Sequence, residues 1–428
     1  MSITRSKRTR PPEAEAERAT PAAAEPAASS ARQALEATAV VAICILLALL
    51  LKLFIYDLPH TEPDEQVYWQ LAGNLVNTGR YSLQGTEVLK TLSPGMYDKP
   101  LFHHPPLFPF LLVPFVMADA HQAAVMVPWL GHFLAIVAVG LLGFALRREG
   151  DDEVAPFLPR YWIPIVAIAL DPILLFLSRR LWMDSLLAGF GGMAAALFLL
   201  GLRRKRMGWL AAGGVFLGLA TMTKLTGVLL APVLFLLVFF ELKEKRERQQ
   251  AILWGFVPFT LIVAPWFGVF LARYGVLIPG WINPDAWSLQ HYPFLRAIAN
   301  RPALYYFFQL TVVQPVFPLL VILAIVHWRR ITSFRLAMPF VWMGLTLLVV
   351  SAMGARGLGF QMRHLCPMLA GLYGALYVVM PARTDRSPLA LGILAAAIYG
   401  GATGLVNLVA QVSDLLSISE IARLMAPM

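Results

Sequence analysis

Charged residues are scarce in this chain of 428 residues. Asp, Glu, Lys and Arg make up 14% of it, against about 25% in ordinary soluble domains. Hydrophobic residues make up 58%, and the mean hydropathy of +0.66 is spread along most of the length. This composition excludes a soluble globular enzyme, a nucleic-acid-binding module and a disordered scaffold. It indicates an integral membrane protein with many spans.

Cysteine is nearly absent, and familiar nucleotide-binding motifs do not occur. Cys44 and Cys366 both lie inside apolar runs, which excludes a disulfide framework and a Cys-x-x-Cys metal site. No Gly-x-x-x-x-Gly-Lys-[Ser/Thr] and no strand-anchored Gly-x-Gly-x-x-Gly appears, so a nucleotide cradle is unsupported. The adjacent His103 and His104 do not predict a tight metal site, because consecutive side chains rarely point at one ion. A divalent cation stays open as a cofactor.

Apolar runs of roughly 17 to 25 residues recur along the chain and predict an all-α polytopic membrane protein with about eleven transmembrane helices. Residues 1–36, rich in Ala, Pro, Glu and Arg, predict a disordered cytoplasmic tail. The membrane domain covers 37–411, and 412–428 form a short outer tail. The predicted spans are 37–56, 123–146, 161–178, 185–202, 207–223, 225–241, 251–271, 303–327, 336–353, 364–381 and 388–411.

The positions of the positive charges test this map independently. With the N-terminus in the cytoplasm, most of the 35 Lys and Arg residues fall in the tail and in short inner loops. The net charge of +10 is therefore mainly an orientation signal, and it needs no nucleic-acid partner. The outer face receives large loops at 57–122 and 273–302. The proline-rich segment 104–117 in the first of them predicts an interfacial or re-entrant helix.

The first outer loop carries an acidic cluster. Asp64 and Glu65 open a helical pattern that places Asp64 on one side with Tyr68, and Glu65 on the next side with Trp69. Two carboxylates beside an aromatic platform at the membrane boundary suit a general base that acts on a hydroxyl. The alternative is structural: Thr61 caps a short helix whose first turn favours acids.

A second group of polar residues lies in the later outer turns. Asp184 is a further catalytic candidate, with an N-cap role as the alternative. Cations on the outer side, which normally lacks them, call for a phosphate or carboxylate partner, and the alternative is snorkelling to lipid head groups. His103 and His104 suit hydrogen bonding to phosphate or substrate. The candidate cations and the histidine beside them are Arg179, Arg180, Lys224, Arg356, Arg363 and His364.

In these features the chain resembles GT-C-fold glycosyltransferases of the dolichyl-phosphate-mannose protein mannosyltransferase superfamily, which includes bacterial lipid A aminoarabinose transferases. The resemblance implies a polyprenyl-phosphate-linked sugar as donor, used on the outer face, and a catalytic base at Asp64. The aminoarabinose transferases carry a lysine where this chain has His104. The matching residues are Pro63-Asp64-Glu65 with Tyr68, His104-Pro105-Pro106-Leu107, Ser178-Arg179 with Asp184, Gly218-Leu219-Ala220 with Lys224 and Gly227, and Arg363 with Pro367.

The chemistry of the residues agrees with this resemblance. A lipid phosphate leaves without needing a proton, so the reaction requires a base on one side of the anomeric carbon and cations on the other. In-line displacement would invert the anomeric centre, and an apolar groove beside residues 104–117 would hold the polyprenyl tail. The acceptor is a lipid, a glycan or a protein, and the composition favours a bacterial inner membrane.

Two other classes of function stay open at this point. A secondary transporter or lipid flippase would carry paired halves and ionisable groups near the bilayer midplane. The sequence shows no evident repeat, and its candidate charges lie at the outer ends of spans. A noncatalytic subunit or lipid-binding scaffold that retains the fold is the second alternative.

Overall fold

The computed structural model describes residues 25–54, 63–86, 98–146, 159–277, 304–353, 361–380, 388–404 and 406. All regular secondary structure in these ranges is helical, which confirms the predicted all-α class. Among the described helices, five are long and apolar enough to cross a membrane, and a bent pair would make six. Five shorter apolar helices accompany them, so the total of eleven spans stays a prediction.

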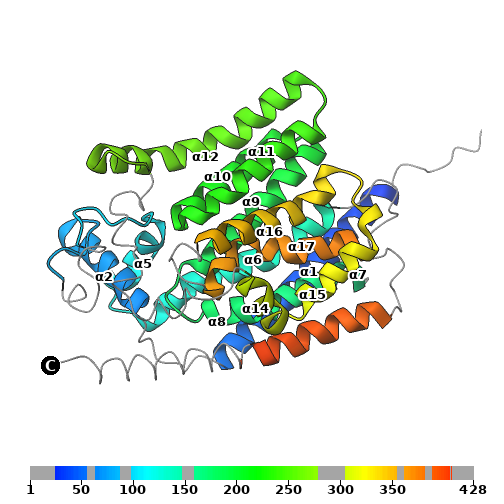
Figure 1. Ribbon diagram of the computed structural model, residues 1–428, viewed down its shortest axis with the longest axis horizontal. Coiled ribbons are helices and arrows are strands. Elements are labelled where there is room, and N and C mark those ends of the chain that lie inside the picture. Colours follow the sequence, from blue (N-terminus) through cyan, green and yellow to red (C-terminus); the bar gives the residue numbers. More distant parts are fainter. Residues whose placement is uncertain are drawn as a thin grey trace, which may run out of the picture.

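The centre of the bundle is α9 (Asp184–Arg204). In its most apolar stretch, 94% of the residues are buried. It packs against α6 (Met126–Ala145), which follows the short η1 (Gln122–Val125), and against α10 (Met207–Thr223). Glycines make the α6–α9 contact close, because a Cβ on Gly189 would lie 2.2 Å from the carbonyl oxygen of Gly131. These helices form the middle of the view in Figure 1.

Beyond α10, the helix α12 (Lys245–Tyr274) runs along the upper edge of the bundle in Figure 1. One of its ends reaches the region of α2 (Pro63–Thr78) and α5 (Leu107–Met117), the two helices of the first predicted outer loop. The Tyr274 hydroxyl donates a 2.7 Å hydrogen bond to the carbonyl of Leu101, which ties α12 to that loop.

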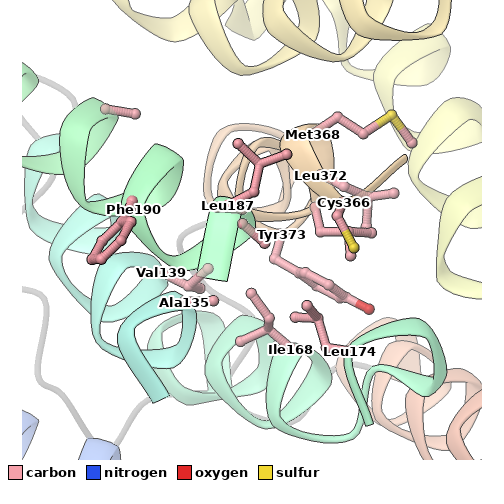
Figure 2. Packing of buried hydrophobic residues seen from close by; sticks show 14 of the residues in the cluster. Ala135, Val139, Ile168, Leu174, Leu187, Phe190, Cys366, Met368, Leu372 and Tyr373 are labelled. Atoms are coloured by element: carbon pink, nitrogen blue, oxygen red, sulfur yellow. The ribbon is translucent and has the colours of Figure 1, made fainter. Parts of the chain in front are cut away.

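The remaining helices complete the bundle around α17 (Leu369–Val379), which lies among α6, α7, α9, α15 and α16. Figure 2 shows Tyr373 and Leu372 of α17 packed with Ile168, Leu174 and Leu187 from three other helices. The bounds of the elements not yet given are α7 (Pro159–Ala169), α8 (Pro172–Leu177), η2 (Leu225–Leu229), α11 (Leu230–Glu241), α14 (Tyr305–Val313), α15 (Val316–Val326), η6 (Trp328–Arg330) and α16 (Phe334–Met353), with a further helix at Pro388–Gly404.

Several predicted spans are not single straight α-helices. The span at 303–327 bends by 106° between α14 and α15, because Pro315 lacks an N–H and pushes Gln314 out of the helical region. The span at 161–178 breaks where Asp171 caps α8, with a 2.8 Å hydrogen bond from the Leu174 N–H. The span at 364–381 starts as the 3-10 helix η8 (Met362–Met368) before it becomes α17.

The break at Asp171 and the break at Gln314 lie next to each other inside the protein. Gln314 donates hydrogen bonds to the Asp171 carboxylate and, at 2.8 Å, to the Tyr373 hydroxyl, which itself donates to Asp171 at 2.7 Å. Buried polar groups need such partners, and each break exposes backbone groups that a neighbour must satisfy. The broken helices are therefore joined by a polar cluster around Asp171.

The N-terminal region also differs from the prediction. Helix α1 (Glu25–Phe54) begins at Glu25, so residues 25–36 are helical rather than part of a disordered tail. Ala, Glu, Arg and Gln are strong helix formers, and Arg32 pairs with Glu36 one turn later at 2.8 Å. Residues 1–24 and the tail 412–428 lie outside the described residues, as does most of the loop 273–302.

Candidate active site

An ion pair between segments far apart in the chain marks one end of the bundle. Asp64 lies in the first turn of α2, and its carboxylate accepts a hydrogen bond from the Arg363 guanidinium of η8, 299 positions away. The Asp64 side chain is 30% exposed and that of Arg363 is 20% exposed. Solvent can therefore reach this pair.

A second ion pair lies close to the first. Lys224, at the break between α10 and η2, donates a 2.7 Å hydrogen bond to Asp184 at the start of α9. Burial lowers the pKa of Arg363, but the carboxylates of Asp64 and Asp184 outweigh that effect and raise it. Both pairs thus belong to one charged cluster. The N-cap alternative for Asp184 is wrong, because Met183 is the N-cap of α9 and Asp184 follows it.

Glu65 has different surroundings from its neighbour Asp64. Its side chain is 1% exposed and accepts a 2.9 Å hydrogen bond from the Leu181 N–H. The Arg180 guanidinium lies 3.4 Å from the same carboxylate. Glu65 and Arg180 therefore join α2 to the turn between α8 and α9, in the interior of the protein. Arg179 is also buried in this turn.

The two histidines lie beside the first ion pair, with ring centroids 4.4 Å apart. The hydroxyl of Tyr68 lies 3.4 Å from Nδ1 of His104. Burial lowers the pKa of His103 to about 4, against the opposing effect of Asp64. Burial lowers the pKa of His104 further below its usual range, and His103, Lys224 and Arg363 add to this. Both imidazoles are neutral near pH 7, so the positive charge comes from arginine and lysine.

Aromatic residues that the sequence analysis did not single out hold the site together. Tyr81 donates from its hydroxyl to the carbonyl of His104 at 3.1 Å. The Tyr306 hydroxyl accepts a 3.1 Å hydrogen bond from the Gln361 N–H and lies 3.1 Å from Nδ1 of His364. Trp182 lies against the Arg363 guanidinium. Only Trp182 had a signal in the sequence, since it lies inside the arginine-rich turn before Asp184.

The remaining candidates are less closely joined to the ion pairs. The Trp69 ring packs edge-on against His121, with centroids 4.5 Å apart. Arg356 lies outside the described residues. Within the described residues, no group of three or more His, Cys, Asp or Glu side chains could hold a metal ion.

A protein family model matches the middle part of the chain. Residues 89–276 match the family model of dolichyl-phosphate-mannose-protein mannosyltransferase. No curated protein sequence matches the chain.

Solved structures share the fold. The structure of ArnT from Cupriavidus metallidurans bound to undecaprenyl phosphate has a TM-score of 0.56 and 20% identity, over 83% of this chain and 62% of that one. The apo oligosaccharyltransferase of Archaeoglobus fulgidus has a TM-score of 0.55 and 14% identity, over 86% of this chain and 56% of that one. This chain thus corresponds to about three fifths of the length of these proteins. The family match supports the resemblance that the motifs indicate, and the likeness to these structures shows that the chain has the GT-C fold.

Proposed function

We propose that this protein is a membrane glycosyltransferase that moves a sugar from a polyprenyl-phosphate donor to an acceptor at the outer face of the membrane. The observation that carries the proposal is the cluster of two carboxylate–cation pairs, Asp64–Arg363 and Asp184–Lys224, at one end of the bundle. The family match and the undecaprenyl phosphate bound to ArnT support this class of donor. A transporter is not favoured, because these charges lie at helix ends.

The exposure of the three acidic candidates separates their roles. Each of the three is paired with a cation, but Asp64 is 30% exposed, whereas Asp184 and Glu65 are 2% and 1% exposed. In this proposal, Asp64 takes the proton from the acceptor hydroxyl as its oxygen bonds to the anomeric carbon. Glu65 positions α2, and Asp184 positions Lys224.

The cations receive the leaving group. As the bond between the anomeric carbon and the phosphate oxygen breaks, negative charge grows on the phosphate, and Arg363 and Lys224 stabilise it. The donor phosphate takes over part of the contacts that the two carboxylates make in the ligand-free protein. The neutral His103 and His104 contribute hydrogen bonds. Attack opposite the leaving group inverts the anomeric centre, which isolation of a product with retained configuration would refute.

The polyprenyl tail has an apolar path beside the site. Helix α5 begins just after His104 and packs against α2, while its Phe110 and Met117 side chains are 52% and 72% exposed. Exposed apolar side chains next to a charged head-group site suit a lipid whose phosphate enters the site. The tail is therefore proposed to lie along α5.

Helix α9 supports a position of the site at the outer face of the membrane. Its 21 residues span about 30 Å, close to the thickness of the hydrocarbon core. Asp184 begins this helix, and Arg203 and Arg204 end it. Positive residues favour the cytoplasmic side, so the charged cluster is proposed to face the periplasm or exterior of a bacterial inner membrane.

A transfer assay with the Asp64→Asn variant tests this function. The purified full chain in lipid nanodiscs is given undecaprenyl-phosphate-linked mannose or aminoarabinose and a membrane extract as acceptor, and release of undecaprenyl phosphate is measured. Loss of the base should lower the rate by about 100-fold or more. Asp119→Asn is the matched control, because Asp119 is exposed in the turn after α5 and its left-handed backbone suits Asn. No transfer by the wild type with either donor, or an unimpaired Asp64→Asn variant, contradicts the proposal.

A further inference from the structure

The turn between α8 and α9 contacts three other parts of the proposed site: α2, Lys224 and η8. Its Leu181 N–H and the Arg180 guanidinium hold Glu65 of α2, and Asp184 at its end holds Lys224. Between these contacts lies Trp182, which contacts Arg363 of η8. One short segment therefore determines how three distant parts of the chain meet.

Trp182 presents the face of its ring to Arg363. The central carbon of the guanidinium lies 5.1 Å from the ring centroid, within the range of a cation–π contact. Trp182 is 8% exposed, and the Phe176 ring packs against it with centroids 6.1 Å apart. Its indole N–H is buried and has no hydrogen-bond partner among the described residues. What the side chain contributes is therefore its ring face, not its N–H.

The Arg363 guanidinium thus has two fixed neighbours, the indole ring of Trp182 and the carboxylate of Asp64. The backbone of η8 is fixed separately, because the Tyr306 hydroxyl accepts from the Gln361 N–H and contacts His364. An arginine side chain has many rotamers, and a flat aromatic surface restricts the plane of its guanidinium. When a phosphate draws Arg363 away from Asp64, the indole is the contact that remains.

We propose that Trp182 is a positioning residue for donor binding: it holds the Arg363 guanidinium in the plane from which it passes from Asp64 to the donor phosphate. This inference rests on the proposed function. The inference gives the two cations different roles. Lys224 acts as a point charge that Asp184 holds, whereas the orientation of the Arg363 guanidinium depends on an aromatic neighbour. Loss of the indole should weaken binding of the lipid phosphate and leave the KM for the acceptor unchanged.

The test compares Trp182→Leu, which removes the ring, with Trp182→Phe, which keeps an aromatic face and lacks the N–H. Affinity for undecaprenyl phosphate and the kinetic constants for transfer are measured with the full chain in nanodiscs. We expect Trp182→Leu to weaken undecaprenyl phosphate binding by about ten-fold, and Trp182→Phe by less than about three-fold. Trp342→Leu, at a buried tryptophan of α16, is the control for loss of an indole from the interior, and it should leave this affinity unchanged.

A double-mutant cycle shows whether Trp182 acts through Arg363. In an Arg363→Lys background, where the planar group is gone, replacing Trp182 by Leu or Phe should add less than a two-fold loss. Equal losses for Trp182→Phe and Trp182→Leu, or losses that multiply fully in the Arg363→Lys background, would overturn the inference. If the Trp182→Leu variant does not fold, the cycle is measured with Trp182→Phe. Absence of transfer and of undecaprenyl phosphate binding in the wild type would instead refute the proposed function.

Discussion

Individual charged residues at the site differ mainly in how far they are buried. The Asp184 side chain is 2% exposed and its partner Lys224 is 18% exposed, whereas both members of the Asp64–Arg363 pair are more open. A buried carboxylate that loses its cation has neither water nor a partner to stabilise it. The Asp184–Lys224 pair therefore has a structural role. The Asp64–Arg363 pair leaves the Asp64 carboxylate accessible for chemistry.

Replacing Lys224 tests this difference. The Lys224→Gln variant should be destabilised by about 3 kcal/mol, because the Asp184 carboxylate would stay buried without its cation. Adding Asp184→Asn should restore much of the stability, since a neutral amide pair can hydrogen bond. Transfer should stay low in both variants because the phosphate has lost a cation. Melting temperature in detergent and the rate of transfer are the measurements, and a double variant no more stable than the single one would contradict this account.

The buried His103 gives the protein a pH dependence of stability. Its pKa is about 4 in the folded protein, below the usual 6.5, so the unfolded chain takes up the proton first as the pH falls. The free energy of unfolding should therefore decrease as the pH falls from about 6.5 to about 4. At pH 5, His103 should account for a loss of about 2 kcal/mol relative to neutral pH. In His103→Gln, the fall in melting temperature between pH 7.5 and pH 5 should be smaller. Equal falls in variant and wild type would show that His103 is not the cause.

At the scale of helices, close packing depends on small residues at the contact between α6 and α9. The backbone of Leu186 lies 2.3 Å from the position that a Cβ on Gly131 would occupy, and Gly189 faces Gly131 with equally little space. In lipid, helices associate through such close contacts, since apolar burial gives no advantage over the lipid tails. The position of Asp184, five residues before Gly189, depends on this contact.

Alanine substitution of Gly189 should separate these helices. The added methyl would overlap the Gly131 carbonyl, and we expect a loss of about 2–3 kcal/mol in stability together with reduced transfer. Gly268 of α12 is the matched control, because a Cβ there meets nothing within 4 Å. Gly268→Ala should be neutral or slightly stabilising. The prediction fails if the two variants have the same melting temperature.

For the whole molecule, the arrangement of helix ends separates the two faces. The charged cluster lies at one end of α9, and the turn at the other end carries Lys205, which pairs with Glu247 at the start of α12 at 2.7 Å. Arg335, at the start of α16, donates its N–H to Glu241 at the end of α11. The cytoplasmic side in the proposed orientation is therefore held together by contacts between neighbouring turns.

Labelling of introduced cysteines tests this orientation. Asp119→Cys places a thiol in the exposed turn after α5, in the first predicted outer loop, and Lys205→Cys places one in the exposed turn at the end of α9 that is remote from Asp184. A membrane-impermeant maleimide should label the first variant in cells with a permeabilised outer membrane, and the second only after the inner membrane is disrupted. The native Cys44 and Cys366 are buried and should react little. The reverse pattern would place the site in the cytoplasm.

The amino-acid sequence by itself determined the all-α class of the protein and which charged residues stand at its helix ends. Apolar runs and charged turns are local features that membrane insertion reads directly, so α2, α9, α10 and α12 lie close to the predicted positions. The breaks at Asp171 and Gln314 were missed because hydropathy does not show which polar residue inside an apolar run will find a partner. Asp171, Gln314 and Tyr373 satisfy one another only in the folded bundle.

Only the tertiary structure decided which charges meet. Asp64 and Glu65 are neighbours in the sequence, yet one faces Arg363 with an open side chain and the other is buried against Arg180. Pairing depends on distances between segments up to 299 positions apart, which no local pattern contains. The same reason explains why Tyr306 had no signal: its hydroxyl gains its role from Gln361 and His364, which helix packing brings to it.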